Sequence, residues 1–385
     1  SLSLSRVLCL PPCPGSPGPN GLARHLETKS AQYGRPPGAA AAMSRSCFSY
    51  TAARDRCYSR SFASAGLRSA TVALHGGATT VHCWVPRGGA DPAKPSLLLI
   101  HGFGANATWQ WDAHLRPLLL SGFNVYVPDL LFFGDSTTAR PDRTVAFQAG
   151  CLAEAMDALG VARASLVGIS YGGFVGYRLA AAYPDRVDRL VLCCAGVCLE
   201  ERDLREGLFV VDDAREAAAL LIPQTPEKLR KLMQLSLFRP PRLVPSCFLS
   251  DFIHVMCTDF VEEKTELILA LINDWKLSDL PKISQPTLII WGEQDRIFPL
   301  ELGHRLSRHL EGNCELVVIK NAGHAVNLEK PKEFCKHLKS FLIDSSSKIA
   351  KTSHKVLEKC LLVEGATSHW PAAVDHAAEE GKGLV

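Results

Sequence analysis

A serine flanked by glycines is the residue of this chain best suited to nucleophilic chemistry. It lies in Gly168-Ile169-Ser170-Tyr171-Gly172, between an apolar run that predicts a strand and one that predicts a helix. Glycines at these places remove side chains where a strand-to-helix turn is tightest, so the serine hydroxyl can project from the top of a sheet. Free N–H groups at the start of the helix would lie near any oxyanion formed there. The pattern predicts Ser170 as a nucleophile.

A carboxylate and a histidine follow in the order that such a serine requires. The strand-like run 286–291 leads to Asp295, and the next one, 315–319, leads to His324. Histidine, with an ordinary pKa of about 6.5, can take and return the serine proton, and a carboxylate on its other ring nitrogen would fix the tautomer. We therefore predict a triad of Ser170, Asp295 and His324, with Glu293 as the alternative acid.

Main-chain donors for an oxyanion are expected upstream. The buried strand predicted at 97–100 runs into His101-Gly102-Phe103-Gly104, a loop poor in side chains, where N–H groups can turn toward a ligand. The N–H of Phe103 would pair with that of Tyr171, and removing one such donor costs roughly 3 to 4 kcal/mol of barrier. His101 itself is expected to be a structural turn residue.

From about residue 68 to residue 344 the chain resembles the α/β-hydrolase superfamily. The motifs that carry the resemblance are the serine turn, the oxyanion loop, Gly292-Glu293-Gln294-Asp295 and Gly323-His324, and the block 127–136 is similar to a plant subgroup described as lipase-like or monoacylglycerol-lipase-like. The resemblance implies the same triad. It argues against haloalkane dehalogenases and epoxide hydrolases, which place an aspartate where this chain has Ser170.

Strands and helices alternate, which predicts an α/β fold, the α/β-hydrolase fold, with a mostly parallel eight-stranded sheet flanked by helices. A hairpin at 71–74 and 80–85 is expected at the edge, and helices are expected across 152–159 and from Pro331. The parallel strands are expected at 97–100, 124–127, 165–168, 189–193, 287–291 and 316–319.

The interval between the fourth and fifth parallel strands is too long for one crossover and predicts an inserted helical cap at 199–280. The predicted core is then 67–198 and 281–345, with a disordered leader at 1–66 and a disordered tail at 346–385. The cap is rich in apolar residues, which favours an acyl chain or another hydrophobic ester as substrate. The residues expected to line the pocket are Trp109, Phe132, Phe248 and Phe252.

Composition agrees with a single enzyme domain plus tails. The 385 residues are 47% hydrophobic, and the formal net charge is only +3. No zinc spacing, phosphate-binding loop or RNA motif occurs, so we expect no metal, no cofactor and no nucleic-acid partner. No apolar run approaches the roughly 18 residues of a membrane span, so no integral membrane segment is expected. The 14 cysteines are expected to be unpaired in a reducing compartment.

These features predict a cytoplasmic protein, with one alternative. The leader is rich in Arg and Ser and poor in acids, like a transit peptide, which would place the protein in a chloroplast or mitochondrion. Met43 could instead begin a shorter protein.

The function expected from these residues is cleavage of a carboxylic ester through an acyl-enzyme on Ser170, with no cofactor and a small hydrophobic ester as the partner. Two alternatives stay open. One is a carbon–carbon bond hydrolase with the same triad, and the other is a receptor-like protein of the same fold that binds its ligand and turns over slowly. The sequence specifies neither the physiological substrate nor the oligomeric state.

Overall fold

The structure, a computed structural model, describes residues 49–273 and 276–344. The chain divides into two units after Lys339. In the described residues the second unit contributes one short π-helix, Ser340–Asp344, and all the elements below belong to the first unit. The predicted tail at 346–385 and the leader up to residue 48 lie outside the described residues.

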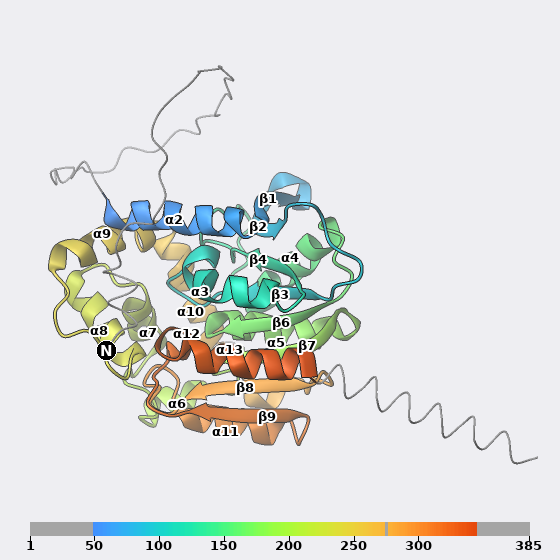
Figure 1. The fold of residues 1–385 in the computed structure, drawn as a ribbon. Coiled ribbons are helices and arrows are strands. Elements are labelled where there is room, and N and C mark those ends of the chain that lie inside the picture. The colour runs from blue at the N-terminus through green and yellow to red at the C-terminus, as the bar shows by residue number, and fades with distance from the viewer. Residues whose placement is uncertain (1–48, 274–275, 345–385) are drawn as a thin grey trace, which may run out of the picture. The chain divides into compact units, whose positions relative to one another are not determined.

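A mostly parallel sheet forms the centre of the first unit, as the sequence predicts (Figure 1). The order is β1-β2-β4-β3-β6-β7-β8-β9, in which β1 and β2 form the predicted antiparallel hairpin, β2 pairs antiparallel with β4, and the strands from β4 to β9 run parallel. A two-residue strand, β5, pairs with β2 and makes a ninth strand that the sequence pattern did not predict, because two residues show no period. The bounds are β1 Leu67–Leu74, β2 Thr79–Pro86, β3 Ser96–Ile100, β4 Asn124–Pro128, β5 Thr137–Thr138, β6 Ala164–Ile169, β7 Val187–Cys193, β8 Thr287–Gly292 and β9 Cys314–Ile319.

Helices cover both faces of this sheet. α3 contacts α13 on one face and α4 contacts α5 on the other (Figure 1). β3, β6, β7 and β8 are almost entirely buried, which explains why they read as continuous apolar runs in the sequence. The bounds are α3 Ala107–Leu119, α4 Val145–Ala158, α5 Tyr171–Ala182, α11 Leu300–His309, α12 Val326–Glu329 and α13 Pro331–Lys339, with short 3₁₀ turns at His75–Gly77, Pro184–Arg186 and Leu277–Asp279.

Five helices are inserted between β7 and β8, in the interval where the sequence predicts a helical cap. They are α6 Glu201–Arg205, α7 Ala214–Leu221, α8 Pro226–Ser236, α9 Ser246–Met256 and α10 Val261–Asn273. The arrows of β8 and β9 point toward the side on which α7 and α8 lie (Figure 1). Buried Leu220 and Ile268 of the insertion join Ile297 of the core in one apolar cluster, so the inserted helices and the loop after β8 share a core.

The prediction that the leader is disordered is wrong where the structure contains a helix. Residues 50–64, expected to be disordered, form α2, Tyr50–Ser64, which begins at the side-chain cap Ser49. Phe62 is fully buried and Tyr58 nearly so, and α2 contacts α3, β1 and the inserted helix α9. The sequence pattern did not predict this helix because the segment has low hydrophobicity. A few large side chains, rather than a continuous apolar stripe, pack it on the fold.

Two other expectations bear on the described residues. All ten cysteines there are free. None of the helices at 49–273 or 276–344 is long and apolar enough to cross a membrane.

Candidate active site

Ser170 lies at the turn between β6 and α5 in a strained backbone conformation. Its φ of 52° and ψ of −121° fall outside the regions that a non-glycine residue ordinarily occupies. A Cβ on Gly168 would lie 2.4 Å from the carbonyl oxygen of Gly172, and one on Gly172 would lie 2.4 Å from that of His101. Side chains at either position would therefore prevent the turn from closing, which is the reason the sequence has glycine at both.

The serine, the histidine and the aspartate form a continuous hydrogen-bonded chain. His324 Nε2 lies 3.0 Å from Ser170 Oγ, and its Nδ1 lies 2.8 Å from Asp295 Oδ2. Oδ1 of Asp295 accepts the main-chain N–H groups of Ile297 and Phe298, so both carboxylate oxygens are occupied and oriented. The Asp295 side chain is fully buried and that of His324 is 13% exposed. Such an arrangement lets the imidazole take a proton from the serine while the carboxylate holds its tautomer.

Glu293 does not lie in this chain of hydrogen bonds. Its exposed carboxylate accepts from the side chain of Gln294 and from the N–H of Asn321. Cys194 is the other group at this place: its sulfur lies within 4.8 Å of ligand atoms of Asp295 and His324, which is the one metal-compatible cluster among the described residues. Burial raises the pKa of the Cys194 thiol well above its usual value, which favours the neutral thiol beside His324 and Asp295.

Main-chain donors are available beside the serine. Within the described part of the chain, neither the N–H of Phe103 nor that of Tyr171 donates a hydrogen bond. The side-chain oxygen of Gln110 accepts the N–H of Gly102, and Asn106 caps the start of α3. The loop is therefore anchored on both sides of Phe103. These two N–H groups are therefore available to bind an oxyanion formed at Ser170.

His101 is a structural residue, as expected. It is fully buried, its Nε2 accepts the N–H of Leu130, and its Nδ1 bonds to the carbonyl oxygen of Gly102. Burial lowers its pKa, which matches a neutral ring that donates from one nitrogen and accepts on the other.

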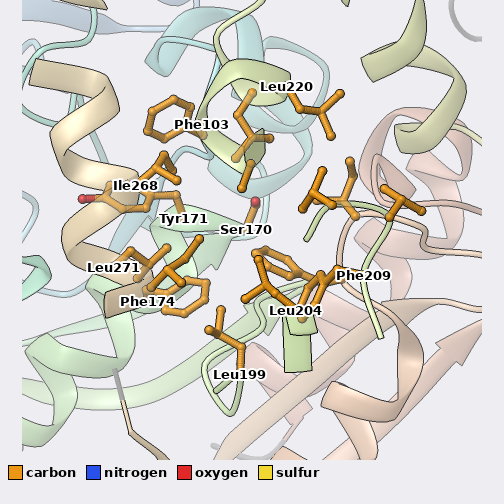
Figure 2. Close-up of a pocket in the computed structure, with 17 residues that line it drawn as sticks. Phe103, Ser170, Tyr171, Phe174, Leu199, Leu204, Phe209, Leu220, Ile268 and Leu271 are labelled. Atoms are coloured by element: carbon orange, nitrogen blue, oxygen red, sulfur yellow. The ribbon is translucent and has the colours of Figure 1, made fainter. Parts of the chain in front are cut away.

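Two cavities open onto Ser170 and share Phe103, Leu221 and Ile297. The first, which we call the small half, has a volume of about 60 Å³ and is lined almost entirely by apolar side chains (Figure 2). The second, the large half, has a volume of about 250 Å³ and includes His324 and other polar residues. In both, inserted helices provide much of the wall.

The four aromatic residues predicted to line the pocket divide into two pairs. Trp109 and Phe252 line the large half and contact each other, their ring centroids 5.7 Å apart. Phe132 lines neither half of the site. It adopts a left-handed φ of 73° and lines a separate polar cavity, with its ring near Phe260. Phe248 lies against Tyr50 of α2, a helix that the sequence did not predict, and lines neither half.

Glu329 is a residue of the site that the sequence analysis missed. Its carboxylate accepts the N–H of Gly323, directly before His324, and the N–H groups of Phe238 and Arg239 at the end of α8. Ala325, directly after the histidine, donates to the carbonyl of Ser236. The loop that carries His324 is thus tied to the insertion on both sides, a link that joins residues distant in sequence and leaves no local signal.

The family "alpha/beta hydrolase fold" matches residues 95–331, and this chain belongs to it. The match agrees with the strand order, the serine turn and the order of the three site residues. The protein is thus an α/β hydrolase that is similar to lipases and esterases.

Relatives and solved structures are consistent with this class. The chain is 27% identical over 283 residues to "Monoacylglycerol lipase abhd6-A" of Xenopus laevis, covering 71% of this chain and 82% of that one. It is 27% identical to "Monoacylglycerol lipase ABHD6" of Homo sapiens, covering 65% and 75%. A bacterial membrane phospholipase A is similar at a TM-score of 0.62 and 27% identity, covering 76% of this chain and 89% of its own. An esterase from Thermogutta terrifontis has a TM-score of 0.56 at 25% identity, covering 71% and 98%.

Proposed function

We propose that this protein hydrolyses a hydrophobic carboxylic ester through an acyl-enzyme on Ser170. The observation that carries the proposal is the hydrogen-bonded chain from Ser170 through His324 to Asp295, beside two free main-chain donors and at the junction of two cavities. The curated relatives named above are monoacylglycerol lipases, which supports ester hydrolysis.

In the first step His324 Nε2 takes the hydroxyl proton as Ser170 Oγ attacks the ester carbonyl carbon. The carbonyl oxygen becomes an oxyanion held by the N–H groups of Phe103 and Tyr171. The imidazolium then returns its proton to the leaving alcohol as the carbon–oxygen bond breaks. In the second step His324 takes a proton from water as the water oxygen attacks the acyl carbon, and the imidazolium then returns that proton to Ser170 Oγ as the acyl carbon–oxygen bond breaks and the acid is released. No cofactor is required.

The test is hydrolysis of p-nitrophenyl esters by the full chain and by Ser170→Ala. We expect at least about a 10³-fold loss of kcat in the variant, because triad members act as a unit. Ser278→Ala, which changes an exposed serine away from the site, is the matched control and should keep the wild-type rate. A wild type slower than about one turnover per minute, against a typical enzyme's ten per second, would favour the carbon–carbon hydrolase or the receptor-like protein instead.

The resemblance to a plant lipase-like subgroup remains a prediction, since the curated relatives named above come from Xenopus laevis and Homo sapiens.

A further inference from the structure

The two halves of the cavity differ in chemistry as well as in size. The small half is lined by side chains such as Phe174, Phe209 and Ile268 and offers almost no polar surface (Figure 2). The large half includes Gln110, His324 and Asn327 among its lining residues. Ser170 lies between them, so the two parts of an ester attached to this serine would enter different halves.

The direction of proton transfer decides which part enters which half. His324 must return its proton to the oxygen of the departing alcohol, so the alcohol has to leave on the side of the imidazole. His324 lines the large half and does not line the small one. The alcohol is therefore on the side of the large half, and the acyl chain extends into the small half.

The volumes then limit the size of each part. A cavity of about 150 Å³ holds one benzene molecule, six carbons. At about 60 Å³ the small half holds a shorter group, whereas the large half, at about 250 Å³, holds more than one such ring. By the same ratio the small half accommodates on the order of two to three carbons beyond the carbonyl carbon, which is bound to Ser170.

A polar group in the large half points to a polar alcohol. Asn327 is 1% exposed, and its side-chain nitrogen is buried without a hydrogen-bond partner in the described part of the chain. A buried donor left unpaired costs about 1 to 3 kcal/mol, which a substrate acceptor would recover.

We infer that the substrate is the ester of a short acyl group, acetyl to butanoyl, with a large alcohol, and that Asn327 donates a hydrogen bond to an oxygen of that alcohol. This inference rests on the proposed ester hydrolysis at Ser170. It reverses the order of sizes that a long-chain lipase would show.

Two substrate series measured on the full chain test the assignment. In p-nitrophenyl esters, kcat/KM should fall at least about fivefold from butanoate to octanoate, because overfilling a packed cavity costs about 1 to 3 kcal/mol and 1.4 kcal/mol is tenfold. In acetate esters, kcat/KM should rise from ethyl to octyl acetate. A preference for octanoate would overturn the inference and leave ester hydrolysis standing. Failure to hydrolyse any ester would overturn the proposed function and this inference with it.

Two matched phenylalanine variants test which part of the ester occupies which half of the cavity. Phe209→Ala widens the small half and should raise the octanoate-to-butanoate ratio at least about fivefold, because it removes the clash. Phe252→Ala widens the large half and should change the octyl-to-ethyl acetate ratio while leaving the acyl ratio as in the wild type. Each ratio is taken within one variant, so a partly misfolded preparation does not alter it. A shift of the acyl ratio in Phe252→Ala alone would contradict the assignment.

Asn327 is tested by its apolar counterpart of similar shape. Asn327→Leu should lower the ratio of kcat/KM for glycerol monobutanoate to that for propyl butanoate by about fivefold, the worth of one hydrogen bond of about 1 kcal/mol. Any general loss of rate from the neighbouring His324 cancels in this ratio. An unchanged ratio would remove Asn327 from alcohol recognition.

Discussion

At the scale of single residues, one carboxylate orients the base. Asp295 uses one oxygen for two main-chain N–H groups and the other for His324. The sequence offered Glu293 as a rival because both acids follow the same strand. Only the turn after β8 determines which of them faces the histidine, and the exposed Glu293 bonds to Gln294 and Asn321 instead.

The first prediction compares these two acids. Asp295→Asn should lower kcat by about 10⁴, because the amide cannot hold the tautomer that the serine needs. Glu293→Gln should change kcat by less than about threefold, since exposed substitutions away from such networks act within about 0.5 kcal/mol. Steady-state hydrolysis of p-nitrophenyl butanoate measures both, and the reverse order would move the acid to Glu293.

A second residue-scale prediction concerns acid stability. His114 of α3 is fully buried next to Phe334, and burial lowers its pKa to about 4. A depressed pKa means that the unfolded chain takes up the proton first, so the free energy of unfolding falls as pH drops from about 6.5 toward 4. Between pH 7 and pH 4.5 the wild type should lose about 2 kcal/mol more than His114→Leu in urea unfolding. An equal loss of unfolding free energy in the wild type and in His114→Leu would contradict this role of His114.

At the scale of elements, the structure confirms the strands and helices that carry strong periodic or continuous apolar patterns, including the hairpin and the serine turn. It also contains what such patterns do not show. α2 was missed because few of its side chains are buried, and Phe248 was misplaced as a consequence, since it packs on that helix. Phe132 was misplaced because a left-handed backbone turns it toward another cavity.

α2 gives the third prediction. Phe62→Ala should lower the free energy of unfolding by about 3 to 5 kcal/mol, as for other buried phenylalanines. Arg60→Ala, at an exposed position on the same helix, should change the free energy of unfolding by less than about 0.5 kcal/mol. Chemical denaturation of the full chain measures both. Equal stability of the two variants would mean that α2 does not pack on the fold as described.

The fourth prediction concerns Glu329, which links the insertion to the loop that carries His324. Glu329→Gln keeps the shape but weakens the charge-assisted bonds to Gly323, Phe238 and Arg239, so His324 should be held less firmly. We expect kcat to fall about tenfold or more with a smaller change in KM, because small misplacements of a catalytic group cost up to about 10²-fold. Glu333→Gln, at an exposed position on α13, is the control. Equal rates for the two variants would show that this link does not position the base.

At the scale of the first unit, the sheet and the inserted helices together make the site. The sheet places Ser170, Asp295 and His324 in the segments that follow β6, β8 and β9, while the insertion supplies much of the wall of the two cavities. That Ser170, Asp295 and His324 lie together could be predicted from the sequence, because each residue follows a strand whose pattern is local. The division of the cavity into two halves could not, since it depends on how distant helices pack around Ser170.

Stoichiometric labelling tests whether Ser170 is the covalent centre of the site. The full chain is treated with a fluorophosphonate in increasing amounts, residual ester hydrolysis is followed, and the labelled peptide is located by mass spectrometry. We expect one label per chain, on Ser170, with activity lost in proportion to labelling and no label on Ser170→Ala. A label on another residue, or full labelling at Ser170 with hydrolysis retained, would contradict it.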